Sequence, residues 1–191
     1  IRNGETGKSP ATCTMEIENV TITGALHDAQ HGDIESRTQA TTHVIGSDGA
    51  DSWVVNPQSI GTISFDLGDG NDTVNGGTST GALTIDGGDG NDSLTGGSGA
   101  DTFVGGAGDD TFVGGGGVDT ASYDVELTAA DFDGTGGTFT LAVDGTDTLG
   151  VERVVDASGD VFWLVSAGGS IQAAVNAAAD GDTILIPEGT Y

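Results

Sequence analysis

The sequence predicts an all-β fold, a parallel β-solenoid with stacked turns, accompanied by one short α-helix. Three observations favour this fold. A nine-residue pattern repeats four times without interruption between Gly87 and Ser122. Looser copies of the pattern precede it from Gly46 onward, separated by short runs with strand-like alternation. A single helix pattern follows Ser170. A fixed period of this kind indicates structural units stacked on one another, so it determines the architecture around it.

The pattern assigns a residue type to five of its nine places. Glycine fills the first, second and fourth places, aspartate the sixth, and an apolar residue the eighth. The four tandem copies are GGDGNDSLT, GGSGADTFV, GGAGDDTFV and GGGGVDTAS. Two looser copies lie upstream, GSDGADSWV at 46–54 and LGDGNDTVN at 67–75. The plain runs at 60–66 and 81–86 alternate like strands and complete the coils that these two copies begin.

The spacing predicts four coils, which cover residues 46–66, 67–86, 87–104 and 105–122. One edge of the solenoid then carries four pattern turns and the other edge carries two. The inward residues are expected to form two stacks. The first consists of Trp53, Val74, Leu94 and Phe112; the second consists of Phe65 or Ile63, Leu83 or Ile85, Phe103 and Ala121. The shrinkage from Phe to Ala at the last repeat suits the end of a stack.

The flanking residues divide into three further segments. Residues 1–45 contain one strand-like run with a turn after it, MEIENVTITG at 15–24, and are interpreted as the end of a β-helix-like coil region. Residues 123–160 are expected to be irregular β structure that covers the last strands of the solenoid. Residues 161–191 are expected to form a strand, a helix with Ser170 as N-cap and Gly181 at its C-terminal cap, and another strand. The expected apolar face of that helix consists of Ile171, Ala174, Val175 and Ala178.

The composition is strongly acidic. The chain has 30 Asp and Glu residues against 4 Lys and Arg, for a formal charge of −26. This balance argues against a nucleic-acid partner, because phosphate contacts need basic side chains. Closely spaced carboxylates repel each other, so folding needs a counter-charge, and a divalent cation is the economical one. The alternative is a disordered acidic tail, which the regular apolar places disfavour.

The sequence also argues against an internal disulfide and against a membrane span. Cys13 is the only cysteine, so no internal disulfide forms and stability has to come from packing or metal. No apolar run of about 18 residues is present, so the sequence predicts no membrane span.

The residue types of the pattern suit calcium. Glycine permits positive φ and close approach of neighbouring turns, while the aspartate adds a carboxylate to outward-facing backbone carbonyls. Calcium takes six to eight hard oxygen ligands in loose geometry, whereas magnesium demands an octahedron and keeps its waters. Zinc would need Cys or His ligands, which the pattern lacks.

Residues 46–122 resemble the repeats-in-toxin (RTX) family, whose nonapeptides form a parallel β-roll with calcium between the turns. The resemblance implies carboxylate ligands from the sixth-place aspartates and carbonyl ligands from the second and fourth places. Third-place aspartates add further oxygens. Counting the gaps between stacked turns predicts about four calcium ions. The residues so implied are Asp48, Gly49, Asp51, Asp69, Gly70, Asp72, Gly88, Asp89, Gly90, Asp92, Gly97, Gly99, Asp101, Gly106, Gly108, Asp110, Gly115, Gly117 and Asp119.

The flanks resemble a second family, the pectate-lyase-like right-handed parallel β-helices. The string NVTITG at 19–24 is similar to one coil of such a helix, and SIQAAVNAAADGDTILIPEGTY at 170–191 is similar to its opening. The segment is therefore expected to lie within a longer protein.

Two functions remain open from the sequence. The first is a calcium-locked structural module of a secreted or cell-surface protein, such as an adhesin, a surface layer or a filament. This module would fold on calcium binding and would associate head-to-tail or lie in tandem with covalent neighbours. The second is an export and folding appendage of a secreted polysaccharide-active enzyme, such as an epimerase or a lyase. The chain itself is predicted not to be an enzyme, because no catalytic constellation is evident beyond the repeat carboxylates.

Overall fold

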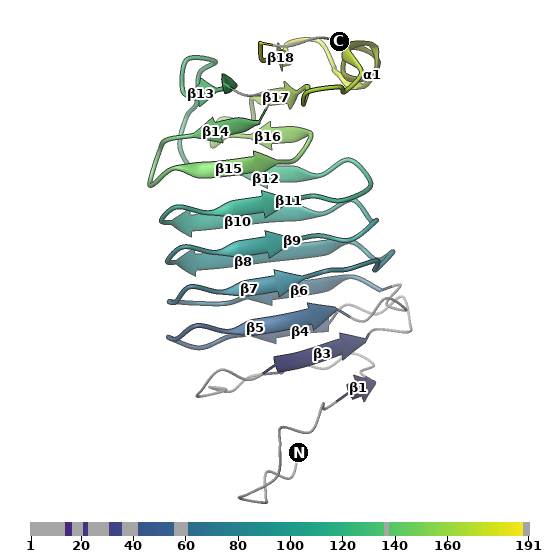
Figure 1. Cartoon of the computed structure of the whole chain (residues 1–191), viewed down its shortest axis with the longest axis vertical. Coiled ribbons are helices and arrows are strands. Elements are labelled where there is room, and N and C mark those ends of the chain that lie inside the picture. Colours follow the sequence, from purple (N-terminus) through teal and green to yellow (C-terminus); the bar gives the residue numbers. More distant parts are fainter. Residues whose placement is uncertain are drawn as a thin grey trace, which may run out of the picture.

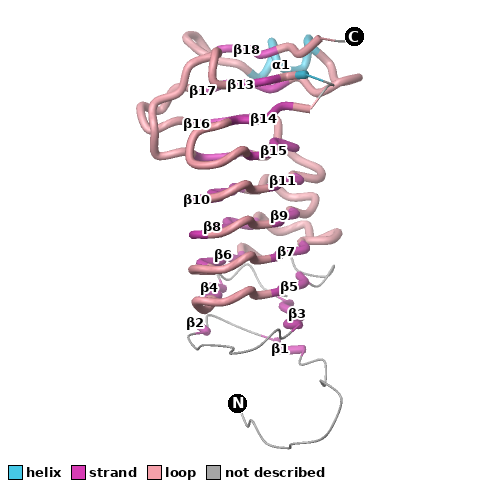
Figure 2. Tube along the Cα trace, turned by 60° about the vertical axis from the view of Figure 1, so that its left-hand side comes forward, coloured by secondary structure: helices cyan, strands magenta, loops and turns pink. Residues whose placement is uncertain are grey.

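The computed structural model describes residues 14–16, 21–22, 31–35, 42–55, 61–135 and 138–188. Within these ranges the chain winds as a β-solenoid, and each coil contributes one strand to each of two facing sheets (Figure 1). Figure 2 shows the two sheets as separate columns of strands along the long axis. The all-β solenoid predicted from the sequence is confirmed.

The first sheet, sheet A, takes every second strand of the chain up to residue 113, and then three later strands in reverse chain order. It contains β1 (Thr14–Glu16), β3 (His31–Glu35), β5 (Ser52–Val55), β7 (Thr73–Asn75), β9 (Ser93–Thr95), β11 (Thr111–Val113), β15 (Asp147–Gly150), β14 (Phe139–Leu141) and β13 (Phe132–Asp133).

The second sheet, sheet B, consists of the intervening strands. Starting from the C-terminal end of the solenoid, it contains β18 (Thr183–Leu185), β17 (Val161–Leu164), β16 (Arg153–Val155), β12 (Thr120–Ser122), β10 (Thr102–Ala107), β8 (Leu83–Asp89), β6 (Ile63–Asp66), β4 (Thr42–Ile45) and β2 (Thr21–Ile22).

The core is a thin column of apolar side chains between the sheets. In sheet A, parallel pairing aligns Trp53 with Val74, Val74 with Leu94 and Leu94 with Phe112, as the repeat spacing predicts. In sheet B, Ile63 and Phe65 are two residues apart in β6 and both point inward. Each therefore has its own stack, because alternate residues of a strand share a face.

The two stacks of sheet B continue differently along the solenoid. Phe65 lies beside Ile85, followed by Phe103 and Ala121. Ile63 pairs with Leu83. The sequence left open which of each pair faces the core, and the structure buries both.

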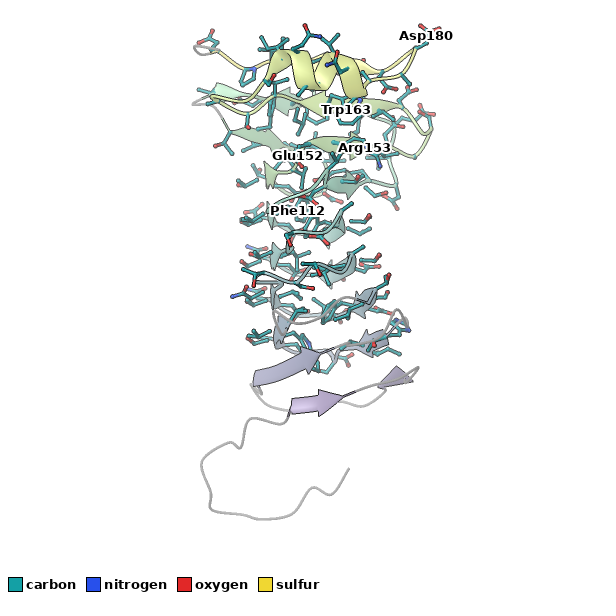
Figure 3. The ribbon with its side chains drawn as sticks, turned by 90° about the vertical axis from the view of Figure 1, so that its right-hand side faces the viewer. Phe112, Glu152, Arg153, Trp163 and Asp180 are labelled. Atoms are coloured by element: carbon teal, nitrogen blue, oxygen red, sulfur yellow. The ribbon has the colours of Figure 1, made fainter. Side chains whose placement is uncertain are left out.

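The solenoid does not end at Ala121. Val154 of β16 pairs with Ala121 in parallel, and Leu149 of β15 pairs with Phe112. Residues 147–155 thus add a further coil after the intervening loop that includes β13 and β14. Figure 3 shows Glu152 and Arg153 one level beyond Phe112 along the long axis. The expectation that the stack ends at Ala121 is therefore wrong.

Strand direction reverses beyond this added coil. β14 pairs antiparallel with β15 in sheet A, and β17 pairs antiparallel with β16 in sheet B. These two strands cover edges that the parallel coils would otherwise leave unpaired. The covering role expected for residues 123–160 thus falls in part to β14, and β17 lies beyond that segment.

The described residues of the N-terminal run at 15–24 belong to two short strands. β1 pairs in parallel with β3 in sheet A, and β2 pairs in parallel with β4 in sheet B. The coils therefore extend upstream of the repeats. The remaining residues of that run, including Ile17, Val20 and Gly24, lie outside the described residues.

The helix α1 (Ile171–Ala177) begins where the sequence predicts. The Ser170 side chain accepts a hydrogen bond from the Ala173 N–H, which is the geometry of an N-cap. The helix ends earlier than expected, with Ala178 as C-cap, and Gly181 lies in the turn before β18 with φ of 102°. None of the helical residues is buried, and Val175 is 50% exposed. Of the predicted apolar face, Ile171, Ala174 and Ala178 are partly buried, whereas Val175 is exposed.

Candidate metal sites

Two edges of the solenoid carry the glycine–aspartate turns. The first edge joins sheet B to sheet A through the turns at 46–51, 67–72, 87–92 and 105–110. The second edge joins sheet A to sheet B through the turns at 96–101 and 114–119. The stacking of four turns on one edge and two on the other agrees with the coil map predicted from the sequence.

The sixth-place aspartates tie consecutive coils together. One carboxylate oxygen, Oδ1, accepts a hydrogen bond from the backbone N–H of the sixth-place residue one coil earlier. Asp51 N donates to Asp72, Asp72 N to Asp92, and Asp92 N to Asp110, at 2.7, 2.7 and 2.8 Å. On the second edge, Asp101 N donates to Asp119 at 2.8 Å. Each carboxylate therefore lies in the gap between its own turn and the preceding one.

The second oxygen, Oδ2, has no hydrogen-bond partner in four of these aspartates. They are Asp72, Asp92, Asp110 and Asp119, and all four side chains are at most 2% exposed. Each belongs to a turn that has a pattern turn before it, so there is one unpartnered oxygen in each of the four gaps. A buried carboxylate oxygen without a donor is costly, because nothing replaces the water that it loses.

The first turn on each edge behaves differently. Asp51 Oδ2 accepts hydrogen bonds from Ser47 N at 2.8 Å and Ser47 Oγ at 3.2 Å. Asp101 Oδ2 accepts one from Gly97 N at 2.7 Å. These carboxylates are satisfied within their own turns.

Backbone conformation separates the two kinds of turn. In the four turns with an unpartnered oxygen, the second-place glycine has φ between 94° and 101°; these residues are Gly68, Gly88, Gly106 and Gly115. Gly97, whose N–H caps its own carboxylate, is not among the positive-φ glycines of the described chain. Glycine reaches positive φ without steric penalty, which explains its place in the pattern.

Carbonyl oxygens face the same gaps. A Cβ on Gly88 would collide with the second-place carbonyl of Gly68, and a Cβ on Gly90 would collide with the fourth-place carbonyl of Gly70. The same relation joins Gly106 to Gly88 and Gly108 to Gly90. Second- and fourth-place carbonyls therefore point at the following turn, and the Gly68 carbonyl accepts a hydrogen bond of 3.1 Å from Asp89 N there. On the second edge, Gly97 and Gly99 face Gly115 and Gly117 in the same way.

The third-place aspartates Asp48, Asp69 and Asp89 are exposed. They lie on the outer surface of the first edge, and no unpartnered buried oxygen belongs to them. Their proposed contribution as additional ligands stays a prediction, as does that of Asp51, Asp101 and Gly49 in the first turns.

Burial raises the pKa values of the gap carboxylates. Desolvation raises the pKa of Asp72 to about 7, with Asp92 and Asp51 adding to the rise and the hydrogen bond from Asp51 N opposing it. Desolvation likewise raises the pKa of Asp110 and of Asp119 to about 6. The pKa of Asp92 is raised for the same reason. A cation in the gap would reverse this cost, because it favours the charged form.

The donor set fits a hard cation of loose geometry. Each gap combines backbone carbonyls with one buried carboxylate oxygen, and oxygen ligands of this kind suit calcium. No group of three or more His, Cys, Asp or Glu side chains that could hold a metal is found among the described residues. Backbone oxygens must therefore supply much of any coordination shell.

Sequence reasoning missed a fifth turn on the first edge, at 142–147. Asp110 N donates to Asp147 Oδ1 at 3.0 Å, which repeats the tie between consecutive coils. On the second edge, Asp119 N donates to Glu152 Oε2 at 2.9 Å. The string DGTD at 144–147 keeps the third, fourth and sixth places of the pattern and was the available signal.

Comparison with protein families agrees with this geometry. Residues 64–79 and 86–121 match the model of the RTX calcium-binding nonapeptide repeat, in four copies. The repeat region is an RTX β-roll. RTX nonapeptide repeats bind calcium, which agrees with the oxygen ligands in the gaps. The match ends at residue 121, so the added turn at 142–147 lies outside the RTX repeats that the model recognises.

Searches of curated proteins and of solved structures found no match to the chain. In the part of the chain that the structure describes, no helix is long and apolar enough to cross a membrane.

Proposed function

We propose that this chain is a calcium-locked structural module, in which ions lie in the four gaps between stacked RTX turns. The observation that carries the proposal is the set of four buried carboxylate oxygens without hydrogen-bond donors, one in each gap. Three gaps lie on the first edge and one lies on the second. The proposed ligands are Asp72, Asp92, Asp110 and Asp119 together with the second- and fourth-place carbonyls of the preceding turns.

The formal charge gives calcium a second role, in folding. The chain has a formal charge of −26, and few basic side chains are present to offset it. Without the ions, repulsion and desolvation of the gap carboxylates oppose the compact state. With them, binding free energy becomes folding free energy. The β-roll therefore folds when calcium is supplied.

This coupling supports a location outside the cell, at the surface or in the medium. Extracellular calcium modules bind with Kd on the order of 10⁻⁴–10⁻³ M. A roll of that affinity would stay unfolded at low calcium and fold where calcium is abundant. In such a place it would serve as a rigid link in an adhesin, a surface layer or a filament.

Self-association is part of the same proposal. At the two ends of the described solenoid lie different strand edges, β1 and β2 at one and β13 and β18 at the other. A head-to-tail contact between them would be heterologous and would extend into a filament. β18 runs opposite to β16, because β17 pairs antiparallel with β16 and parallel with β18. An in-line copy would therefore add antiparallel pairing in sheet B. In sheet A, β14 pairs antiparallel with both β13 and β15, so β13 runs parallel to β15 and the added pairing would be parallel. Sedimentation velocity with and without calcium tests this, and a monomer under all conditions would refute it.

Equilibrium dialysis of the full chain against calcium tests the ion sites. We expect about four ions per chain, by counting the gaps that hold oxygen ligands suited to calcium. A chain that binds no calcium would overturn the proposal. A count of one to three would leave calcium binding intact but refute one ion per gap.

A further inference from the structure

We propose that the hydroxyl group of Tyr123 takes the place of a cation in the fourth gap of the first edge, and so ends the row of calcium sites. This inference rests on the proposed function, because it assumes that the three preceding gaps of this edge hold ions. It concerns the gap between the turns at 105–110 and 142–147, which lies beyond the recognised RTX repeats.

This gap shares two features with the three before it on the same edge. Asp147 is 1% exposed, and its Oδ1 accepts from Asp110 N as Asp110 Oδ1 accepts from Asp92 N. A Cβ on Gly145 would collide with the carbonyl oxygen of Gly108, as a Cβ on Gly108 would with that of Gly90. The two facing turns of this gap therefore again contribute a fourth-place carbonyl and a sixth-place carboxylate.

One contact distinguishes this gap from the others. Asp147 Oδ2 accepts a hydrogen bond of 2.7 Å from the Tyr123 hydroxyl group. The corresponding oxygens of Asp72, Asp92, Asp110 and Asp119 have no donor. Burial and the Asp147 carboxylate raise the pKa of Tyr123 above its usual value, so the phenol keeps its proton and remains a donor.

The position of Tyr123 in the chain explains how it reaches this gap. It follows β12 directly, where a further nonapeptide would begin with its first-place glycine. In the repeats that first place lies against the carboxylate: a Cβ on Gly105 would collide with Asp110 Oδ2. At Tyr123 a phenol comes from this side instead, and the loop that follows delivers the rest of the turn at 142–147.

The chemical consequence is a coil that needs no metal. A neutral donor satisfies the buried oxygen of Asp147 with one hydrogen bond, whereas a calcium ion would require a full shell of oxygen ligands. The first edge therefore holds three ions, and the coil at 142–155 closes the row independently of calcium.

The test counts bound calcium by equilibrium dialysis in the full chain. Tyr123→Gly restores the first-place glycine and removes the phenol, so we expect it to bind one ion more than the wild type. Adding Asp147→Asn to that variant should return the count to the wild-type value. In the wild-type background, Asp147→Asn alone should leave the count unchanged, because the gap holds no ion there.

The outcomes separate this inference from the proposed function. A wild-type chain without calcium would overturn both. A wild type with ions in its four gaps and a folded Tyr123→Gly variant with the same count would overturn the role of Tyr123 alone. If Tyr123→Gly does not fold, Asp147→Asn decides: an unchanged count supports the inference, and the loss of one ion refutes it.

Discussion

The backbone N–H of Asp92 donates a 2.8 Å hydrogen bond to Oδ1 of Asp110, while Oδ2 of the same carboxylate has no donor. One side chain thus ties two coils together and keeps an oxygen available in the gap between them. In Asp72, Asp92 and Asp119 as well, Oδ1 accepts a backbone hydrogen bond from the preceding coil, while Oδ2 has no donor.

Replacing Asp110 with Asn should remove one calcium ion. The amide oxygen can still accept from Asp92 N, but the charge in the gap is lost, and calcium prefers carboxylate ligands. Equilibrium dialysis should give one ion fewer than in the wild type. Asp109→Asn is the matched control: it changes the charge equally at the adjacent, exposed place, and the count should not change. An equal loss in both variants would indicate a general charge effect instead of a specific ligand.

Removing calcium should expose Trp53. Its side chain is 5% exposed inside the roll, so its fluorescence reports on the core between the sheets. In a Trp163→Phe background, which leaves Trp53 as the only tryptophan, adding a chelator should shift the emission to longer wavelength. Restoring calcium should reverse the shift. A spectrum that does not respond to the chelator would contradict calcium-dependent folding.

Acid should weaken calcium binding. The gap carboxylates must lose their protons to bind the ion, and burial raises the pKa of Asp72 to about 7 and of Asp110 and Asp119 to about 6. The calcium concentration at half-folding should therefore rise by about tenfold or more between about pH 7.5 and 5.5. A calcium titration followed by circular dichroism measures this, and a midpoint independent of pH would contradict it.

The calcium-free fold should show the opposite dependence on pH. The pKa values of its gap carboxylates Asp72, Asp110 and Asp119 lie above the ordinary value of 3.8, so between 3.8 and 6 to 7 these groups bind more protons in the folded state than in the unfolded state. Its stability is therefore fully present below pH 3.8 and is lost as the pH rises through 6 to 7. Circular dichroism with chelator should show more β structure at pH 4 than at pH 8.

A methyl group at Gly90 should disrupt the stacked turns. Gly90 has φ of 138°, and a Cβ there would collide with the carbonyl oxygen of Gly70. Gly90→Ala should cost about 2–4 kcal/mol in denaturant unfolding with calcium present, from strain and overpacking together. Gly49→Ala is the matched control, because Gly49 fills the same fourth place in the first turn and a Cβ there meets nothing within 4 Å. It should change stability by about 0.5 kcal/mol or less.

The aromatic pair across the core should dominate the packing energy. The rings of Phe103 and Phe112 come from opposite sheets and stack with centroids 5.7 Å apart and 17° between their planes. Phe112→Ala should destabilise the calcium-bound roll by about 3–5 kcal/mol. Val113→Ala, at the next residue and 46% exposed, should have little effect. Similar losses for both would show that the backbone, not the ring, sets the cost.

The period of the nonapeptide was sufficient to predict the coils, the inward stacks from Trp53 to Phe112, and the two edges of turns. The reason is local: alternation assigns Leu94 or Phe103 to the core, and glycine assigns Gly88 and Gly90 to turns that approach their neighbours closely. Ser170 was likewise recognisable as an N-cap, because the capping hydrogen bond joins its side chain to a backbone N–H only three residues later.

Contacts across the loop at 123–146 depended on the tertiary structure. Asp147 stacks on Asp110 although 37 residues separate them, and no fixed period leads from one to the other. The same holds for Tyr123, an aromatic residue at a strand end, whose hydroxyl group meets Asp147 only once the loop closes. Which sixth-place oxygens lack a donor also required the fold, because Asp51 and Asp72 have the same place in the pattern but receive different hydrogen bonds from their turns.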